Sequence, residues 1–480
     1  MVKKIIKFIY IFLVFFLLFK VEAFGETLNL NSDKYILYNL NDNIVLLNKN
    51  ENQETYIASL TKMMTVIVAI ENIEDYNKKV IITKEMFKDI AWDVSVAGFK
   101  VGEKVTYNDL LYGAILPSGA DAVNALALSI SGSYDDFIEL MNQKAKDLSL
   151  KHTHFANVTG LFNENNYSSA YDVAEILKYA LKNKKFKEVF ETKRYTFSNG
   201  KIVKSTIESY NSRNGGKNIS YIKGAKTGFI NAAGYCLAST STIDGVDYLL
   251  VTLNADKSKS APHINDAITA YTYFSKNYSY MNIVDNSDVI VDLKAKNSKE
   301  KEIKIKSNVK IDKYLKNDFS KENVKYIYDG VKEISYFTKK GTVLGKVDVM
   351  YGDKKLDTFD LVYSGGLTFS IFAFMWNNLF LIIFISFALF ISFRIVQLNM
   401  KRKKRLKRKL QTKCWEPLYV YMHLYAFHYK ICFDVSIFFY VKIFISKITY
   451  LFFMMIIETI LIYMKKIIYW QVCDKTLQYY

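Results

Sequence analysis

The sequence predicts an α+β domain in which helices flank an antiparallel sheet built from both ends of one segment. Two hairpin patterns carry this prediction. Short apolar runs at 34–38 and 44–47 are separated by a polar turn at 39–43, which is typical of a β-hairpin. Runs at 234–242 and 247–254 flank Asp244-Gly245, a strong hairpin signal. Between the two hairpins the apolar residues recur at helical spacing.

The N-terminus has the pattern of a secretory signal peptide over residues 1–23. Lys3, Lys4 and Lys7 precede an apolar run at 8–19, and a small-residue site follows at 21–23. An uncleaved anchor is the alternative. Either interpretation places the next segment outside the cytoplasm.

A membrane span is predicted at 367–393. No charged residue occurs from Leu361 to Phe393, and this stretch exceeds the roughly 20 residues that cross a bilayer. Residues 401–409 contain eight lysines and arginines, and such flanks stay in the cytoplasm. We therefore predict a single-pass protein of the cell membrane, with its main body on the extracytoplasmic side.

The formal net charge of +18 is partly explained by this basic run. Positive charge beside a span attracts anionic lipid, so membrane lipid is a predicted partner and nucleic acid is not. The predicted division of the chain is a catalytic domain at 24–279, a small β-rich stalk domain at 280–365, and the span. A basic cytoplasmic segment with an atypical hydrophobic tail follows at 394–480, where 448–463 could form a second span.

Helical segments are predicted after Ser59 and in five further stretches. The helix after Ser59 follows from an apolar run at 63–70 without glycine or proline. Pro117 ends another predicted helix. The five further stretches are 109–116, 121–130, 134–150, 168–182 and 263–278.

The stretch Ser59-Leu60-Thr61-Lys62 is the strongest candidate for chemistry. Residues three apart lie one turn apart on a helix, so the hydroxyl and the amine can meet. A lysine removed from water loses its charge more readily and can act as a base for serine. The spacing alone is weak, because Ser198…Lys201 and Ser298…Lys301 share it in polar stretches. A helix-capping serine beside a solvated lysine is the ordinary interpretation of such a pair.

Two downstream segments distinguish Ser59 from these other pairs. Pro117-Ser118-Gly119-Ala120-Asp121 and Lys223-Gly224-Ala225-Lys226-Thr227-Gly228 follow it in order. Three elements in this order, at domain-scale spacing, form a strong signal.

Neither the cysteines nor the histidines predict a metal site or a cofactor. Of four cysteines only Cys236 falls in the exported part, inside an apolar run, so a buried free thiol is expected. The five histidines do not cluster, and no ligand spacing of the zinc type is present.

The three motifs resemble those of the D-alanyl-D-alanine carboxypeptidases, the low-molecular-mass penicillin-binding proteins, over residues 27–365. The resemblance implies a serine-type hydrolase with a β-lactamase/transpeptidase-like fold, acting in peptidoglycan biosynthesis and cell shape. It implies peptidoglycan stem peptides as the substrate, from which the terminal D-alanine is released. β-Lactam antibiotics are implied as covalent inhibitors.

The resemblance also implies roles for individual residues. Ser59 would form an acyl-enzyme, Lys62 would take its proton, and Ser118 would pass a proton to the departing amine. Lys226 and Thr227 would receive the substrate's terminal carboxylate. Gly228 would allow the ligand backbone to approach closely, and the N–H groups of Ser59 and Phe229 would form an oxyanion hole.

One departure from the family pattern is Ala120, where asparagine is usual. Asn124, one helical turn later, is a candidate substitute. Two other functions stay open at this point. One is a β-lactamase, for which the region 163–166 lacks the usual glutamate context. The other is a catalytically silent, membrane-anchored protein that binds the cell wall.

Overall fold

A computed structural model describes residues 28–411 of the chain. The predicted signal peptide and the hydrophobic tail beyond Gln411 lie outside the described residues. Two compact units are present. The first holds residues 28–290, 306–329 and 345–361, and the second holds 291–305, 330–344 and 362–411. The domain boundary at 279/280 stays a prediction.

A five-stranded antiparallel sheet is the centre of the first unit, as predicted. Its strand order is β2-β1-β9-β8-β7, so the first hairpin pairs with the last through β1 and β9. Asp244 and Gly245 turn the chain between β8 and β9, both at positive φ. The strands are β1 (Ser32–Asn39), β2 (Ile44–Lys49), β7 (Ile222–Ile230), β8 (Gly234–Ile243) and β9 (Val246–Ala255).

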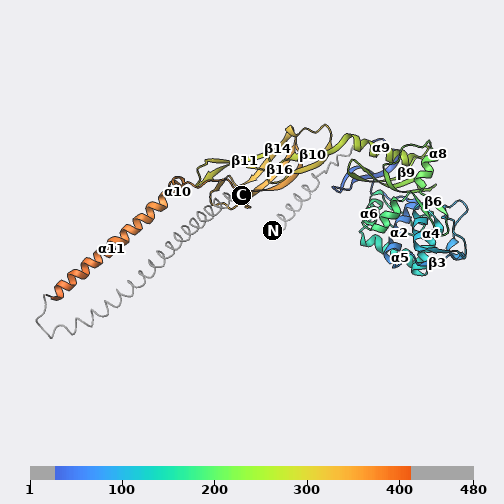
Figure 1. Ribbon diagram of the computed structural model, residues 1–480, viewed down its shortest axis with the longest axis horizontal. Helices are drawn as coiled ribbons and strands as arrows, with labels where there is room; N and C mark the ends of the chain where they lie inside the picture. Colours follow the sequence, from blue (N-terminus) through green and yellow to red (C-terminus); the bar gives the residue numbers. More distant parts are fainter. Residues whose placement is uncertain (1–27, 412–480) are drawn as a thin grey trace, which may run out of the picture. The chain divides into compact units, whose positions relative to one another are not determined.

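The two faces of this sheet bury different cores. Ile36 and Tyr38 of β1 belong to the larger core with the helical lobe, whereas Tyr35 and Leu37 belong to the smaller core with α9. This alternation follows from the two-residue period of a strand. Figure 1 shows α9 on one side of β9, with α2, α4, α5 and α6 on the other.

Six helices of the first unit, α2 to α6 and α9, lie close to their predicted positions, whereas α7 and α8 were not predicted. Several begin at side-chain caps, such as Thr106, Ser133 and Ser169. The helices are α2 (Thr61–Asn72), α3 (Tyr107–Ile115), α4 (Ala120–Ser131), α5 (Tyr134–Asp147), α6 (Ala170–Ala180), α7 (Lys184–Glu191), α8 (Thr206–Arg213) and α9 (Pro262–Asn277), with 3-10 turns η1 (Ala58–Leu60) and η2 (Lys84–Phe87).

Two small two-stranded sheets complete the first unit up to α9. They pair β3 (Lys79–Ile81) with β4 (Lys104–Thr106) and β5 (Arg194–Thr196) with β6 (Ile202–Lys204). Beyond α9 the chain forms only strands and one 3-10 turn until α10. These are β10 (Tyr278–Val284), β11 (Val289–Lys296), β12 (Glu302–Lys306), β13 (Ile311–Lys316), η3 (Lys321–Asn323), β14 (Val324–Gly330), β15 (Glu333–Ser335), β16 (Val343–Tyr351) and β17 (Lys354–Val362).

The predicted span is a broken helix that extends further than expected. α10 (Ile371–Asn377) ends at Asn378, and α11 (Leu379–Gln411) continues into the basic run. Leu379–Leu406 is long and apolar enough to cross a membrane, and no residue in the most apolar part of it is buried. This helix is a candidate membrane anchor.

Candidate active site

Ser59 and Lys62 meet where the chain enters α2. Ser59 lies in η1, directly after Ala58, whose φ of 48° is unusual for a non-glycine residue. Lys62 is in the first turn of α2, and its Nζ donates a hydrogen bond to Ser59 Oγ at 2.8 Å. The structure therefore brings the first predicted pair together.

Lys62 is held in a water-poor environment. Its side chain is 2% exposed, and Nζ also donates to the carbonyl oxygen of Thr159 at 2.5 Å. Burial lowers the pKa of Lys62 to about 7, although Asp121 acts in the opposite direction. A large fraction of the Lys62 amines is thus uncharged at neutral pH, as a base for Ser59 requires.

A second serine–lysine pair lies at the same site. Ser118 sits between α3 and α4 with a φ of 64°. The fully buried Lys226 of β7 donates from Nζ to Ser118 Oγ at 2.7 Å and to the carbonyl oxygen of Thr227 at 2.8 Å. Burial and the nearby charge of Lys62 lower the pKa of Lys226 well below its usual range. The two amines are therefore electrostatically coupled.

Strand β7 runs against the backbone of the candidate nucleophile. A Cβ on Gly228 would lie 3.1 Å from the backbone nitrogen of Ser59 and from the carbonyl oxygen of Ile57, so a side chain there would push the two elements apart. The neighbouring Thr227 Oγ1 donates to Thr206 Oγ1 in α8 at 2.7 Å. Phe229, which follows, is exposed. Because β7 is an edge strand, its other side is not paired within this sheet.

A turn at 157–161 supports Lys62 and was missed as part of the site. Asn157 Oδ1 accepts hydrogen bonds from the backbone nitrogens of Thr159 and Gly160. Thr65 of α2 also donates to the carbonyl oxygen of Val158 at 2.8 Å. An Asn-x-Thr-Gly sequence is typical of a side-chain-stabilised turn, but nothing in that pattern indicates that the carbonyl of Thr159 faces a lysine.

Replacing Gly160 with alanine should destabilise the protein, with a loss of unfolding free energy on the order of 2–4 kcal/mol. Its φ is 79°, and a Cβ would lie 2.0 Å from the carbonyl oxygen of Ala58. Gly132→Ala is the matched control, because Gly132 has the same φ and open space around its Cβ position. Denaturant unfolding of both variants measures the difference. Equal losses would show that the close approach to Ala58 carries no cost.

Asp121, two residues after Gly119, holds the backbone of the loop at residues 97–99. Its carboxylate accepts hydrogen bonds from the backbone nitrogens of Ala97, Gly98 and Phe99. Ala120 beside it is fully buried. The amide nitrogen of Asn124 donates to the carbonyl oxygen of Met86 at 3.1 Å, so this donor is engaged with η2.

The pairs Ser198…Lys201 and Ser298…Lys301, which share the Ser-x-x-Lys spacing, have different partners. Ser198 Oγ donates to Asp109 Oδ2 at 2.6 Å, whereas Lys201 donates to the carbonyl oxygen of Ala97. Ser298 Oγ donates to the carbonyl oxygen of Glu300 at 2.6 Å. Spacing alone therefore does not make a reactive pair.

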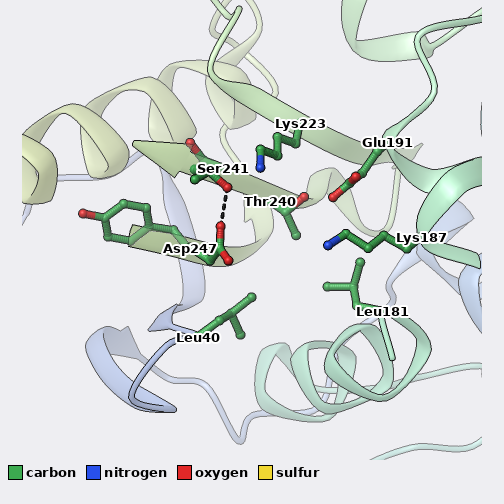
Figure 2. A pocket seen from close by; sticks show the side chains of 10 residues that line it. Leu40, Leu181, Lys187, Glu191, Lys223, Thr240, Ser241 and Asp247 are labelled. Carbon is green, nitrogen blue, oxygen red and sulfur yellow. Dashed lines mark hydrogen bonds between the residues drawn. The ribbon is translucent and has the colours of Figure 1, made fainter. Parts of the chain in front are cut away.

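A separate cavity of about 90 Å³ lies among α7 and strands β7–β9. Figure 2 shows charged side chains of both signs around it, namely Lys187, Glu191, Lys223 and Asp247. None of its lining residues belongs to the Ser59, Ser118 or Lys226 cluster. The cavity is thus distinct from the candidate active site.

Comparison with known proteins agrees with this geometry. The family model for D-alanyl-D-alanine carboxypeptidase matches residues 21–257. The chain is 30% identical to D-alanyl-D-alanine carboxypeptidase DacF of Bacillus subtilis over 312 residues, covering 63% of this chain and 77% of the relative. It is 38% identical over 200 residues to the D-alanyl-D-alanine carboxypeptidase of Streptomyces sp. strain K15, covering 39% and 68%.

The structural comparison concerns the fold. Penicillin binding protein 5 from Haemophilus influenzae aligns with a TM-score of 0.53 at 23% identity, covering 72% of this chain and 99% of that protein. The predicted α+β fold of the β-lactamase/transpeptidase type and the serine peptidase class are confirmed. The chain belongs to the D-alanyl-D-alanine carboxypeptidase family.

Proposed function

We propose that this protein is a serine-type D-Ala-D-Ala carboxypeptidase that removes the terminal D-alanine from peptidoglycan pentapeptide stems through an acyl-enzyme on Ser59. One observation carries the proposal. The buried Lys62 amine lies 2.8 Å from Ser59 Oγ, next to a second buried lysine bonded to Ser118. Such a paired arrangement can both activate a hydroxyl and protonate a leaving amine.

Acylation begins with the uncharged form of Lys62. Its lone pair accepts the Ser59 proton while Oγ attacks the carbonyl carbon between the two D-alanines. The negative oxygen of the tetrahedral intermediate accepts hydrogen bonds from the backbone nitrogens of Ser59 and Phe229. The C–N bond then breaks, and Ser118 gives its proton to the departing amine and regains one from the adjacent lysines.

Lys226 and Thr227 bind the terminal carboxylate of the substrate. In the described structure the two partners of Lys226 Nζ are neutral oxygens. A carboxylate beside this amine favours its charged form, so Lys226 takes up a proton as the substrate binds. The charged pair then fixes the end of the peptide, and water later hydrolyses the ester on Ser59.

The β-lactamase alternative requires an efficient route to deacylation. Glu164 is the acidic residue in the region where such enzymes carry their dedicated glutamate, but here it is exposed. The buried Asn166 donates to Thr61 Oγ1 at 3.2 Å and accepts from the backbone nitrogen of Ala156. These contacts give the region a structural role and favour the carboxypeptidase.

Mass spectrometry of the full chain, with penicillin and separately with a pentapeptide ending in D-Ala-D-Ala, tests the proposal. A lasting adduct of the penicillin on Ser59 together with release of D-alanine is the expected result. Penicillin turnover much faster than adduct accumulation would identify a β-lactamase. If no adduct forms and Ser59→Ala behaves identically, the silent wall-binding protein is the correct interpretation.

The remaining proposals concern location. α11 crosses the cell membrane once, the catalytic unit lies on the extracytoplasmic side, and membrane lipid is a partner through this span. The basic run after residue 400 supports this orientation. Protease protection of the C-terminal side in sealed membrane vesicles distinguishes it from the reverse orientation.

A further inference from the structure

A group of aromatic rings gathers in the second unit, immediately before α11. Phe337 follows β15, and its ring centroid lies 6.1 Å from those of Phe369 and Phe374. Tyr336 packs on Phe369 at 5.2 Å. More than 30 residues separate the loop after β15 from α10 in the sequence, so the fold builds this group from two segments.

Backbone hydrogen bonds hold both segments in place. In the loop, the nitrogen of Tyr336 donates to the carbonyl oxygen of Lys296, and that of Phe337 donates to Ser335 Oγ. Before α10, the nitrogen of Ser370 donates to the carbonyl oxygen of Asn297. The loop after β15 and the segment before α10 are thus both hydrogen-bonded to the adjacent residues 296 and 297.

Much of this apolar surface is exposed. Phe337 is 59% exposed, and Phe372 and Trp376 of α10 are 82% and 78% exposed. We call Phe337, Phe369, Phe372, Phe374 and Trp376 the aromatic surface. Phe372 and Trp376 are one helical turn apart, on the side of α10 opposite to Phe374, so rings are exposed on both sides of this helix. Leaving large rings in water is unfavourable by about 25 cal/mol per Å², and exposed apolar surface of this kind marks a contact surface.

Charges near the aromatic surface are mainly positive. Lys339 and Lys340 are exposed in the same loop as Phe337, and Lys299 is exposed in the turn that contacts Thr368. The two neighbouring carboxylates are engaged, since Glu333 binds Lys296 at 2.6 Å and Glu300 accepts from the backbone nitrogen of Thr368. Aromatic rings with lysines are the composition of a membrane–water interface.

The length of α11 puts α10 at that interface. A hydrocarbon layer of about 30 Å takes about 20 helical residues. Counted back from Arg394 or from Lys401, where the basic run begins, the outer end of this layer falls between about residues 374 and 381. α10 (Ile371–Asn377) therefore lies at the outer boundary of the hydrocarbon layer, and the loop packed on it lies at the same depth.

We propose that the aromatic surface lies in the outer headgroup layer of the membrane that α11 crosses, with anionic phospholipid as its partner. The protein then contacts the bilayer at two places, the span and the Phe337 loop. This inference rests on the proposed single-pass location.

A tryptophan reporter at Phe337 in the full chain tests the proposal. The four native tryptophans, Trp92, Trp376, Trp415 and Trp470, are replaced by phenylalanine, and Phe337→Trp is added. The protein is reconstituted into phosphatidylglycerol–phosphatidylcholine vesicles whose lipids are brominated either high or low on the acyl chain. Bromine near the headgroup end of the acyl chain should quench the fluorescence about twofold. Bromine near the other end should quench it less, because interfacial rings sit at the headgroup level.

Val331→Trp is the matched control. Val331 is exposed and lies at the opposite end of β15 from Phe337, at most about 20 Å away at about 3.3 Å per extended residue. It should not be quenched. If both reporters are quenched equally, or if the Phe337→Trp reporter is unquenched, the proposal is wrong. The Phe337→Trp reporter could also be protected from the water-soluble quencher acrylamide without being quenched by brominated lipid. That result would overturn the proposal and indicate a contact between protein chains.

Two further measurements separate this proposal from the earlier ones. Circular dichroism spectra that match those of the unmodified protein confirm that each variant is folded, and Tyr336→Trp replaces Phe337→Trp if that variant is not. Resistance to alkaline carbonate extraction reports insertion of α11. Release by carbonate would overturn the single-pass proposal, whereas retention with an unquenched reporter would overturn only the second contact.

Discussion

Ser59→Ala is expected to lose acylation by penicillin and release of D-alanine, with rates reduced on the order of a millionfold. The Ser59 hydroxyl forms the bond to the substrate, and no other hydroxyl contacts Lys62 Nζ among the hydrogen bonds of the described residues. The fold should be retained, because alanine fits the space that serine leaves. Intact-protein mass spectrometry after incubation with penicillin measures the loss directly.

Ser298→Ala is the matched control for this variant. Ser298 shares the Ser-x-x-Lys spacing but donates to the carbonyl oxygen of Glu300, and it belongs to the second unit. Its adduct should form at the rate of the unmodified protein. An adduct that persists in Ser59→Ala, on any residue, would remove Ser59 from the role of nucleophile.

Lys62→Met is expected to be nearly as inactive as Ser59→Ala but more stable against unfolding. The variant lacks the base, so acylation should fall by several orders of magnitude. In the unmodified protein the rate should fall about tenfold per pH unit below pH 7, because the pKa of Lys62 is about 7 and only its uncharged form accepts a proton. Stopped-flow acylation from pH 5 to 9 measures this dependence.

The gain in stability should depend on pH in a defined direction. Between about pH 7 and 10.5 Lys62 is uncharged when folded and charged when unfolded. The unfolded state then binds more protons, so this group makes the free energy of unfolding rise as pH increases. Below pH 7 the destabilisation caused by burying the charged Lys62 amine is at its full size. In that range Lys62→Met should raise the free energy of unfolding by on the order of 1–3 kcal/mol, net of the lost hydrogen bond to Thr159.

The exposed Lys304 provides the comparison. Lys304→Met should change the free energy of unfolding by less than about 0.5 kcal/mol at any pH. Urea unfolding at pH 6 and pH 10 compares the two variants. If the gain of Lys62→Met does not shrink at pH 10, burial of the charged amine is not its cause.

The α+β fold could be predicted because its signals are local. The Asp244-Gly245 turn and the alternating runs around it determine β8 and β9, and the apolar run after Lys62 determines α2. A sheet built from both ends of one segment was also predicted, whereas the pairing of β1 with β9 was not. The break at Asn378 was not predicted, although Asn377 and Asn378 interrupt the apolar run at this point and asparagine is a poor helix former.

Only those residues of the candidate site that belong to sequence motifs could be predicted. Ser59, Lys62, Ser118 and Lys226 could be found by spacing and order, and the structure brings them together. The carbonyl oxygen of Thr159 could not, because any residue supplies a carbonyl and its direction depends on the turn made by Asn157. The suggestion that Asn124 substitutes for the missing asparagine likewise depended on where its side chain points. The Asn124 amide nitrogen donates to the carbonyl oxygen of Met86 instead.

The open edge of β7 has a consequence for which molecules can enter. An unpaired strand edge offers regularly spaced backbone donors and acceptors that only an extended chain can match. We therefore expect extended peptides to pair with this edge in preference to helical or tightly folded ones. Because Gly228 keeps β7 close to Ser59, a peptide paired in this way would meet the nucleophile at a fixed position along its length.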